Sequence, residues 1–244
     1  MYNSPLIVSC GGGVNSGGLL VGLQERGTVV DHILFADTGN RDAEKPETYE
    51  FLDLLSDWLV AHSMPSVTFV RNDGKWGTLE ADCLGGNRLP AIAYGWRTCS
   101  DKYKVRPQVK YLKSLYGPKL DGVTVAVGID AGESHRAKPG NNPYQTVFPL
   151  IEWGWDRDDC AEAIKQAGLP VPIKSACFFC PSSKKHEVKW LRAHHPDLYA
   201  RALRMERGAN LTTIKGLGRS FSWETLVGPE IPRAMPCMCF DGED

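Results

Sequence analysis

The chain has 244 residues, 42% of them hydrophobic, and a formal net charge of −1 at pH 7. This composition supports one sizeable core and excludes a global basic field for nucleic acid, although a local basic patch stays open. No apolar run is long enough to span a bilayer, and no basic segment precedes the first apolar run, so we expect a cytoplasmic protein without a signal peptide or a membrane partner.

Alternating strand and helix patterns over the first two thirds of the chain predict an α/β fold with a mainly parallel sheet. Eight cysteines accompany this pattern. In a reducing compartment, cysteines are more often metal ligands, catalytic thiols or core residues than disulfides.

A glycine-rich stretch follows the first apolar run, which covers residues 6–10. Gly11, Gly12 and Gly13 precede Asn15 and Ser16, and the next apolar segment predicts a helix over residues 19–26. Glycines let the backbone approach an anion closely, and loop amides and the helix start direct free N–H groups at it. The stretch lacks the Walker lysine and the third glycine of the dinucleotide fingerprint. An ordinary glycine-rich turn between strand and helix stays open.

The hexapeptide Gly11-Gly-Gly-Val-Asn-Ser16 resembles the PP-loop, the pyrophosphate-binding loop of the adenine-nucleotide alpha-hydrolase-like superfamily. The usual form there is Ser-Gly-Gly-x-Asp-Ser, so Gly11 replaces the serine and Asn15 the aspartate. The resemblance implies ATP or another adenine nucleotide, with Mg²⁺ as a candidate companion, although Asn15 lacks the charge that favours the ion. The nucleotide-binding residues implied here are Ser9, Gly11, Gly12, Gly13, Val14, Asn15 and Ser16.

The second predicted strand covers residues 29–36 and stops at Asp37 and Thr38. An acidic residue at the carboxyl end of a parallel strand lies where α/β sheets bind ligands, so Asp37 could orient a ribose, a water or a metal ion. A simple turn formed by Asp37 and Thr38 is the alternative. Residues 46–61 follow as a helix opened by a proline, and residues 67–70 as a third strand.

Two short motifs in this region resemble the second-strand motif of the phosphoadenosine phosphosulfate (PAPS) reductase family. They are Phe35-Ala-Asp-Thr-Gly39 and Pro46-Glu-Thr-Tyr49. In that family this region holds the adenine and the ribose. The resemblance therefore implies nucleoside contacts for Phe35, Ala36, Asp37 and Thr38.

Residues 72–96 are rich in glycine and polar residues and predict a long loop over the sheet. The next ten residues surround Cys99 with Arg97, Lys102 and Lys104. Basic side chains beside a thiol favour phosphate or sulfate and lower the thiol pKa. A solvated helix start with a buried Cys99 is the alternative. A similar Arg-x-Cys segment in the PAPS reductase family implies phosphate or substrate contacts for the three basic residues and a catalytic role for Cys99.

A helix is predicted over residues 103–116 and a strand over residues 122–128. The resembling family carries a Gly-Ile-x-x-x-Glu-x-x-Arg element, matched here by Gly128, Glu133 and Arg136. This implies nucleotide contacts for all three, with Arg136 stabilising phosphate charge during catalysis and Glu133 orienting it. A surface ion pair is the alternative. A short strand over 147–151, a helix over 155–166 with Cys160 in its packing face, and a connector over 168–174 complete this part.

A Cys-x-x-Cys pair, Cys177 and Cys180, can chelate one metal ion or two irons of a cluster. Together with Cys99 and one of the tail cysteines, Cys237 or Cys239, it makes a four-ligand set. The choice between zinc and a [4Fe-4S] cluster stays open. PP-loop relatives that thiolate tRNA or modify DNA often carry such a cluster, which favours the cluster here.

Residues 184–207 predict two basic helices broken at a proline, and a basic helical face docks nucleic acid phosphates. We therefore expect tRNA or DNA as a candidate partner, with an ordinary solvated face as the alternative. The basic and histidine residues concerned are Lys184, Lys185, Lys189, Arg192, His194, His195, Arg201, Arg204 and Arg207.

Together these patterns predict a doubly wound, mainly parallel, Rossmann-like α/β domain over residues 1–175. A helical, metal-binding region would follow over residues 176–244. The resemblance implies a PP-loop ATP pyrophosphatase and sulfurtransferase that adenylates a substrate and transfers sulfur to a nucleic acid or a small molecule. A sulfur donor would then be a partner, and a homodimer is one arrangement left open.

Two alternatives remain. The first is a PAPS or APS (sulfonucleotide) reductase with Cys237 or Cys239 as the catalytic nucleophile and a thioredoxin-like reductant. However, the tail reads Pro-Cys-Met-Cys-Phe, where PAPS reductases carry Glu-Cys-Gly-Leu/Ile-His. The second is a non-catalytic nucleotide-binding scaffold with structural zinc.

Overall fold

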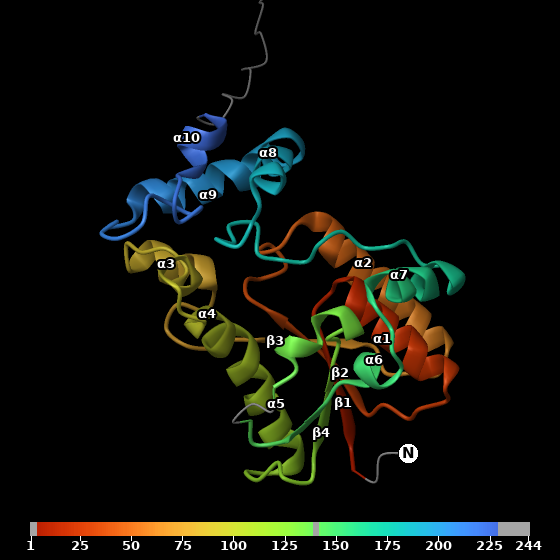
Figure 1. The fold of residues 1–244 in the computed structure, drawn as a ribbon. Coiled ribbons are helices and arrows are strands. Elements are labelled where there is room, and N and C mark those ends of the chain that lie inside the picture. The colour runs from red at the N-terminus through yellow and green to blue at the C-terminus, as the bar shows by residue number, and fades with distance from the viewer. Residues whose placement is uncertain (1–3, 139–141, 229–244) are drawn as a thin grey trace, which may run out of the picture.

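The computed structural model describes residues 4–138 and 142–228. Within these ranges five parallel strands form one sheet in the order β3-β2-β1-β4-β5. Figure 1 shows the sheet with helices on both sides. The strands are β1 (Leu6–Cys10), β2 (His32–Asp37), β3 (Val67–Arg71), β4 (Thr124–Val127) and β5 (Gln145–Val147).

The order of the strands reverses at β1, which pairs with β2 on one side and with β4 on the other. Ile7 lies opposite His32 of β2 and opposite Val125 of β4. In such a sheet the crevice beyond the carboxyl ends of the two diverging strands is where ligands bind. The fold therefore places the glycine-rich loop after β1 next to the segment after β4.

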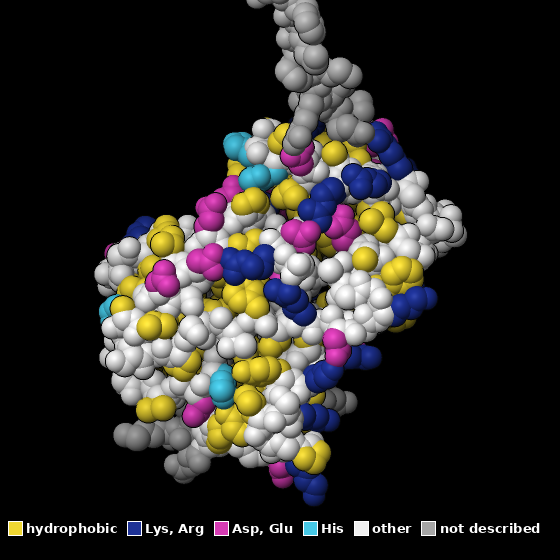
Figure 2. All heavy atoms as spheres, turned by 180° about the vertical axis from the view of Figure 1, so that it is seen from behind, with side chains coloured by type: hydrophobic (Ala, Val, Ile, Leu, Met, Phe, Trp, Pro, Cys, Tyr) yellow, Lys and Arg dark blue, Asp and Glu magenta, His cyan; other side chains and the backbone are white. Residues whose placement is uncertain are grey.

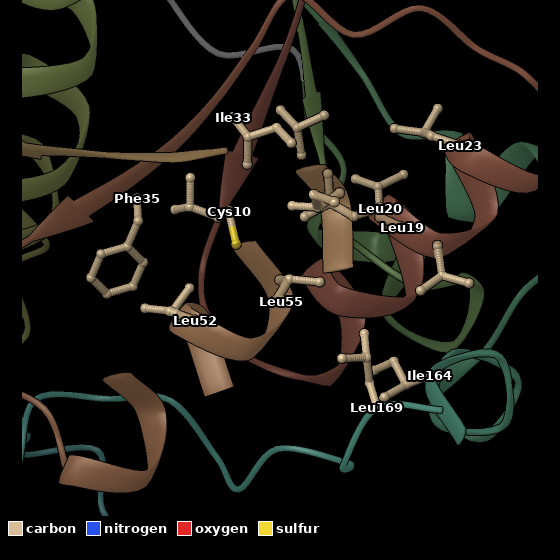
Figure 3. Close-up of a cluster of buried hydrophobic side chains, with 14 of the residues drawn as sticks. Cys10, Leu19, Leu20, Leu23, Ile33, Phe35, Leu52, Leu55, Ile164 and Leu169 are labelled. Atoms are coloured by element: carbon tan, nitrogen blue, oxygen red, sulfur yellow. The ribbon is translucent and has the colours of Figure 1, made fainter. Parts of the chain in front are cut away.

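Alternating side chains of the strands enter two different cores. Leu6, Val8 and Cys10 face a core that also contains α1 (Val14–Glu25), α2 (Pro46–Ala61) and α7 (Arg157–Gln166). Figure 3 shows part of this core, with Cys10 beside side chains of α1 and α2. Ile7 and Leu34 instead face α5 (Arg106–Tyr116). Apolar side chains on both faces of a strand are typical of a parallel sheet covered by helices on both sides.

Helices α1 and α7 pack closely because α1 presents glycines to α7. A Cβ atom added at Gly18 would lie 2.5 Å from the Cβ of Cys160, and one at Gly17 would lie 2.9 Å from Ile164. Cys160 is 0% exposed, which confirms its predicted role in packing. This close approach fixes the first helix, and hence the loop that precedes it, against the rest of the domain.

Several predicted boundaries were wrong. Helix α1 begins at Val14 rather than at residue 19, because its first turn lies inside the glycine-rich stretch. The predicted loop over 72–96 contains α3 (Leu79–Gly85), capped by the Thr78 hydroxyl, and η1 (Ala91–Tyr94). The predicted strand over 147–151 ends at Val147 as β5, and α6 (Pro149–Glu152) replaces the rest. Pro149 lacks the N–H that a strand needs and opens a helical turn.

The segment before α5 is also helical. It comprises α4 (Thr98–Ser100) and a wider turn, η2 (Asp101–Val105), so the helix predicted from residue 103 begins at Thr98. After β4 a short turn of helix, η3 (Ala131–Arg136), is capped by the Asp130 carboxylate, which accepts a hydrogen bond from the Glu133 N–H.

A further core lies beside the sheet domain. It joins α8 (Lys185–His194), α9 (Pro196–Gly208) and α10 (Trp223–Val227) to α3 and Tyr103. Figure 1 shows these three helices gathered next to α3. The predicted break between two helices at Pro196 is confirmed. The predicted domain division at residue 175 stays a prediction, because this core draws side chains from both sides of it.

Within the described ranges, no helix combines the length and hydropathy that crossing a membrane requires. On the face in Figure 2, lysine and arginine side chains are interspersed with aspartate and glutamate rather than gathered into one basic surface. This mixture agrees with the net charge of −1.

Candidate active site

A cavity of about 950 Å³ opens at the carboxyl ends of β1, β2 and β4. It lies at the crevice that the strand order creates. Most residues implied in nucleotide or phosphate binding line it: Ser9, Gly11, Gly13, Val14, Asn15, Ser16, Phe35, Ala36, Lys104, Gly128, Glu133 and Arg136. The structure thus brings together segments that are more than a hundred residues apart in the chain.

The phosphate loop, residues 11–16, leads directly into α1. Gly13 precedes the helix, and the Ser16 hydroxyl accepts a hydrogen bond from the Gly13 N–H (3.2 Å) and donates one to the Gly13 carbonyl oxygen (3.0 Å). The side chain of Ser16 therefore stabilises the loop itself. The free N–H groups of the first helical turn remain for an anion in the cavity.

Gly12 supports this loop without lining the cavity. Its φ is +72°, and an added Cβ would lie 3.1 Å from Thr48 and 3.2 Å from the ring of Phe35. A side chain here would be strained by the backbone and crowded by α2 and β2. Gly12 is thus required for the conformation of the loop, and its predicted nucleotide contact stays a prediction.

The end of β4 approaches the phosphate loop so closely that it needs a glycine. A Cβ added at Gly128 would lie 3.0 Å from the carbonyl carbon and oxygen of Asn15. The Asn15 amide donates a hydrogen bond of 2.7 Å to the carboxylate of Asp130, which is 4% exposed. The Oδ1 atom of Asn15 is buried and has no hydrogen-bond partner among the described residues. The usual PP-loop has an aspartate at position 15. Here the negative charge of that aspartate is carried instead by Asp130, which is hydrogen-bonded to Asn15.

Asp37 does not take the place predicted for it. Its carboxylate is buried and accepts hydrogen bonds from the N–H groups of Gly39 and Arg41 and from the Tyr49 hydroxyl. Neither Asp37 nor Thr38 lines the cavity. The expectation of a ribose, water or metal contact for Asp37 is therefore corrected, because the carboxylate is used in holding the turn after β2. Thr38 instead contacts the Cys177 sulfur with its hydroxyl (3.1 Å).

A buried carboxylate that sequence reasoning missed, Glu44, connects the phosphate loop to the cysteine segment. Glu44 is 2% exposed and forms an antiparallel bridge with Cys177. The Ser175 hydroxyl contacts the Glu44 carboxylate and also lies 2.6 Å from the Gly11 carbonyl oxygen. The Lys104 ammonium lies 3.8 Å from Glu44. No spacing or repeat in the sequence pointed to Glu44 or Ser175, since both act through contacts with distant segments.

The Lys104 side chain lines the nucleotide cavity and lies beside the Glu44 carboxylate. Loss of hydration opposes its charge, but the Glu44 carboxylate stabilises it, and the pKa of the ammonium is raised. Lys104 is therefore protonated at neutral pH. Its position in the cavity wall lets the positive charge act on a phosphate bound there.

The thiol of Cys177 is protonated in the protein without metal. Burial raises its pKa to about 12, although Lys104 acts in the opposite direction. Cys180 follows in a tight turn, with its N–H bonded to the Cys177 carbonyl oxygen (2.9 Å). Cys177 and Cys180 thus lie in one turn, and Cys99 and Cys177 both pack against the core that contains α8, α9 and α10.

Both zinc and iron–sulfur clusters bind cysteine thiolates, so the side-chain type of the described cysteines is suitable for a metal site. In their present placement, no three His, Cys, Asp or Glu side chains within residues 4–138 and 142–228 form a group that could hold a metal ion. Cys237 and Cys239, the predicted tail ligands and nucleophiles, lie outside the described residues. The metal assignment therefore stays a prediction for Cys99, Cys177, Cys180 and the tail.

Two basic residues predicted to contact phosphate do not line the cavity. The Lys102 ammonium pairs with the Asp82 carboxylate at 2.9 Å, and Arg97 is exposed at the start of α4. Lys102 lines a different pocket of about 490 Å³, together with Cys99 and the buried Cys83. Of the basic residues in this segment that were predicted to contact phosphate, Lys104 is the one that lines the nucleotide cavity.

The predicted pairing of Arg136 with Glu133 is confirmed, since their side chains form an ion pair at the edge of the cavity. The guanidinium remains partly exposed, so it is accessible to a ligand. Its contact with phosphate stays a prediction.

The basic helices are less free than the sequence suggested. Arg201 pairs with Glu80 and Asp42, and Arg192 donates to the Val227 carbonyl oxygen. Lys184, Lys185, Lys189 and Arg204 remain exposed, and Lys184 also lines the nucleotide cavity. Part of the predicted basic face therefore serves internal packing.

Comparisons with known proteins bear on the fold. No protein-family model matches the chain, and no curated protein sequence matches it significantly. Among solved structures, the U34-tRNA thiolase NcsA from Methanococcus maripaludis with its [4Fe-4S] cluster superposes with a TM-score of 0.50. The identity is 14%, over 85% of this chain and 73% of that chain.

The two chains share a fold. This likeness confirms the parallel α/β architecture implied by the PP-loop and PAPS reductase resemblance. At 14% identity it establishes the fold alone, and the activity and the cluster in that name belong to the thiolase.

Proposed function

We propose that the protein is an ATP-dependent enzyme that adenylates a substrate oxygen and then replaces it with sulfur, on a nucleic acid or a small molecule. One observation carries the proposal: Lys104, which lines the nucleotide cavity, lies 3.8 Å from Glu44, and Glu44 forms a backbone bridge with Cys177. A nucleotide site joined to a cysteine segment through one ammonium and one carboxylate suits adenylation followed by sulfur transfer. The fold shared with a tRNA thiolase supports the same reaction class.

In this proposal the phosphates of ATP bind at residues 11–16. The N–H groups of the loop and of the first turn of α1 hold the anion, and the positive end of the helix favours it. Arg136 stabilises the charge that develops on the phosphate. Phe35 and Ala36 of β2, which line the cavity, lie beside the nucleoside.

The chemistry has two displacements. A substrate oxygen attacks the α-phosphorus of ATP; a new P–O bond forms, the bond to the bridging oxygen breaks, and pyrophosphate leaves with the electron pair. Hydrosulfide released by a sulfur donor then attacks the activated carbon; a C–S bond forms, the C–O bond breaks, AMP leaves with the electron pair, and the proton on the sulfur passes to solvent. Lys104, charged in both steps, stabilises phosphate charge in the first and sulfur charge in the second.

Cys99, Cys177 and Cys180, with a tail cysteine, would hold a [4Fe-4S] cluster, which would supply a centre for binding the transferred sulfur. Zinc at the same thiols would be structural. Exposed Lys185 and Lys189 on α8 would contact the phosphates of a tRNA or DNA acceptor.

Calorimetry of ATP binding tests the nucleotide site. Removal of a charge-assisted contact in Arg136→Ala should weaken ATP binding roughly tenfold or more. Arg204→Ala, an exposed arginine of α9, serves as the control and should bind like the unmodified protein. The proposal is wrong if ATP does not bind, or if both variants bind it equally well. Tight ATP binding without pyrophosphate release on any acceptor would favour the scaffold alternative.

Anaerobic purification with metal analysis tests the thiol site. We expect a coloured protein with about four irons per chain. Cys177→Ser should lose the iron, whereas Cys160→Ser, in the core between α1 and α7, should keep it. A colourless protein with one zinc would remove the cluster from the proposal. Sulfite formation from PAPS with thioredoxin would instead favour a reductase.

A further inference from the structure

A second pocket of about 400 Å³ adjoins the nucleotide cavity. It lies between the segment 173–178, helix α8 and the first residue of α10. Lys174 and Glu187, whose side chains pair at 2.9 Å, line both spaces. The pocket and the nucleotide cavity therefore meet at this ion pair, and the volume of the pocket falls in the range of small-molecule sites.

Aromatic rings form much of the pocket wall. Phe178, Trp190 and Trp223 all line it. Trp190 stacks on His194 with ring centroids 4.5 Å apart and an angle of 15°, which fixes the orientation of the indole. Flat, fixed aromatic walls suit a flat ligand that stacks on them.

One wall residue carries a polar group without a partner. Trp223 is 0% exposed, and its indole N–H has no hydrogen-bond acceptor among the described residues. A buried donor left unpaired is unfavourable and rare. An occupant with a carbonyl or ring-nitrogen acceptor would satisfy it, which selects a heteroaromatic ligand over a hydrocarbon.

The remaining wall residues supply charge and sulfur. Lys45, Lys174 and His186 place cationic or protonatable groups around the pocket, as a ligand attached to phosphates would need. Cys177 of the Cys-x-x-Cys pair is also part of the wall. A ligand here therefore has the nucleotide cavity on one side and a thiol on the other.

We propose that this pocket, hereafter the aromatic pocket, receives one unstacked nucleobase of a single-stranded nucleic acid acceptor. The inference rests on the proposed function and adds the substrate class and its place. An enzyme that modifies a base must take it out of the stack, and isolated bases are bound by stacking on aromatic side chains. Such a base would extend its carbonyl oxygen toward the nucleotide across the Lys174–Glu187 pair.

Photo-crosslinking tests the proposal directly. A short single-stranded RNA with one 5-iodouridine is irradiated with the full-length protein, and the modified residue is mapped by mass spectrometry. A DNA of the same sequence with 5-iododeoxyuridine is tested in parallel. Whichever strand binds more tightly shows whether the acceptor is RNA or DNA. We expect the modification on Trp190, Phe178 or Trp223. Modification elsewhere, or binding of neither strand, would overturn the proposal.

Affinity measurements add a matched pair of variants. Loss of one stacked ring in Trp190→Ala should weaken binding of the better strand roughly 5- to 150-fold. Trp96 is 69% exposed and lines the other pocket, the one that contains Cys99. Trp96→Ala is therefore the control and should leave binding of the strand unchanged. Trp190→Phe keeps a ring and should retain most of the affinity, which excludes misfolding as the cause. Equal binding by Trp190→Ala and the unmodified protein would contradict the proposal.

ATP binding measured on the same samples separates the two proposals. If ATP binds and base crosslinks fall outside the aromatic pocket, the pocket assignment fails while the proposed function stands. If crosslinks map to the pocket but ATP does not bind, the pocket stands as a base-binding site and the proposed function fails.

Discussion

The side-chain amide of Asn15 in the phosphate loop donates a hydrogen bond of 2.7 Å to the carboxylate of Asp130, 115 residues further along the chain. Asp130 also accepts from the Glu133 N–H at 2.9 Å, so one carboxylate holds both the loop and the turn that carries Arg136. The pair carries one negative charge in a nearly buried position. This hydrogen bond needs one amide and one carboxylate. It should also form if the amide stood at position 130 and the carboxylate at position 15.

Exchange of the two groups should therefore be tolerated better than either single change. Asn15→Asp places two carboxylates in contact, and Asp130→Asn removes the charged acceptor. Each should lower the free energy of unfolding by about 1.5–3 kcal/mol and weaken ATP binding. The double variant Asn15→Asp/Asp130→Asn should recover most of both losses, because the hydrogen bond re-forms with reversed polarity. Chemical unfolding and calorimetry measure both. Simple addition of the two single effects would contradict the coupling.

The close approach of β4 to the phosphate loop gives a second prediction. Gly128→Ala would bring a methyl group to 3.0 Å from the Asn15 backbone, which has no flexible end to move aside. The loop should shift, and ATP binding should weaken by about tenfold or more, since such overpacking costs typically 1–3 kcal/mol. Gly122→Ala, where an added Cβ meets no atom within 4 Å, is the matched control. Isothermal titration with ATP compares them; equal affinities would show that the approach is looser than described.

The contact between α1 and α7 predicts a stability effect without a site effect. In Gly18→Ala the new Cβ would lie 2.5 Å from Cys160 Cβ and 2.7 Å from its Cα, so the helices must separate. We expect a loss of about 1–3 kcal/mol in the free energy of unfolding. Gly208→Ala, at the end of α9 with open space around it, should be neutral or stabilising by about 0.5–1 kcal/mol. Urea unfolding curves distinguish the two, and a Gly18→Ala protein of unchanged stability would argue against the packing.

Cys160 gives a pH prediction. Burial raises the pKa of its thiol from 9.0 to about 12. The unfolded chain therefore releases this proton first as the pH rises, so the contribution of the neutral thiol is complete below pH 9 and is lost toward pH 12. Above pH 9 the free energy of unfolding should fall less steeply with pH in Cys160→Ala than in the unmodified protein. The difference between the two slopes should be up to about 1.4 kcal/mol per pH unit. Leu169→Ala, a cavity in the same core without a titrating group, should keep the original slope.

Some of the fold and site could be predicted from the chain alone because the signals are local. The glycine run at 11–13, the proline at the start of α2 and the break at Pro196 each act within a few residues. Alternating apolar segments likewise predicted a parallel sheet covered by helices. Local sequence patterns also gave two expectations that the structure does not match. Residues 72–96 looked like a loop although Thr78 caps a helix there, and Asp37 looked available although its carboxylate closes the turn after β2.

Only the tertiary structure decided which polar groups meet. Ser175 contacts Gly11 across 164 residues, Glu44 joins Cys177 and Lys104, and Asp130 supplies the charge missing at Asn15. The aromatic pocket likewise forms from α8, α10 and the segment 173–178, none of which shows the pocket by itself. The sequence determines helices and strands through neighbouring residues, whereas the cavity depends on how strand order and helix packing bring distant side chains together. That is why the loop was visible in the sequence, whereas its contacts with Ser175 and Asp130 were not.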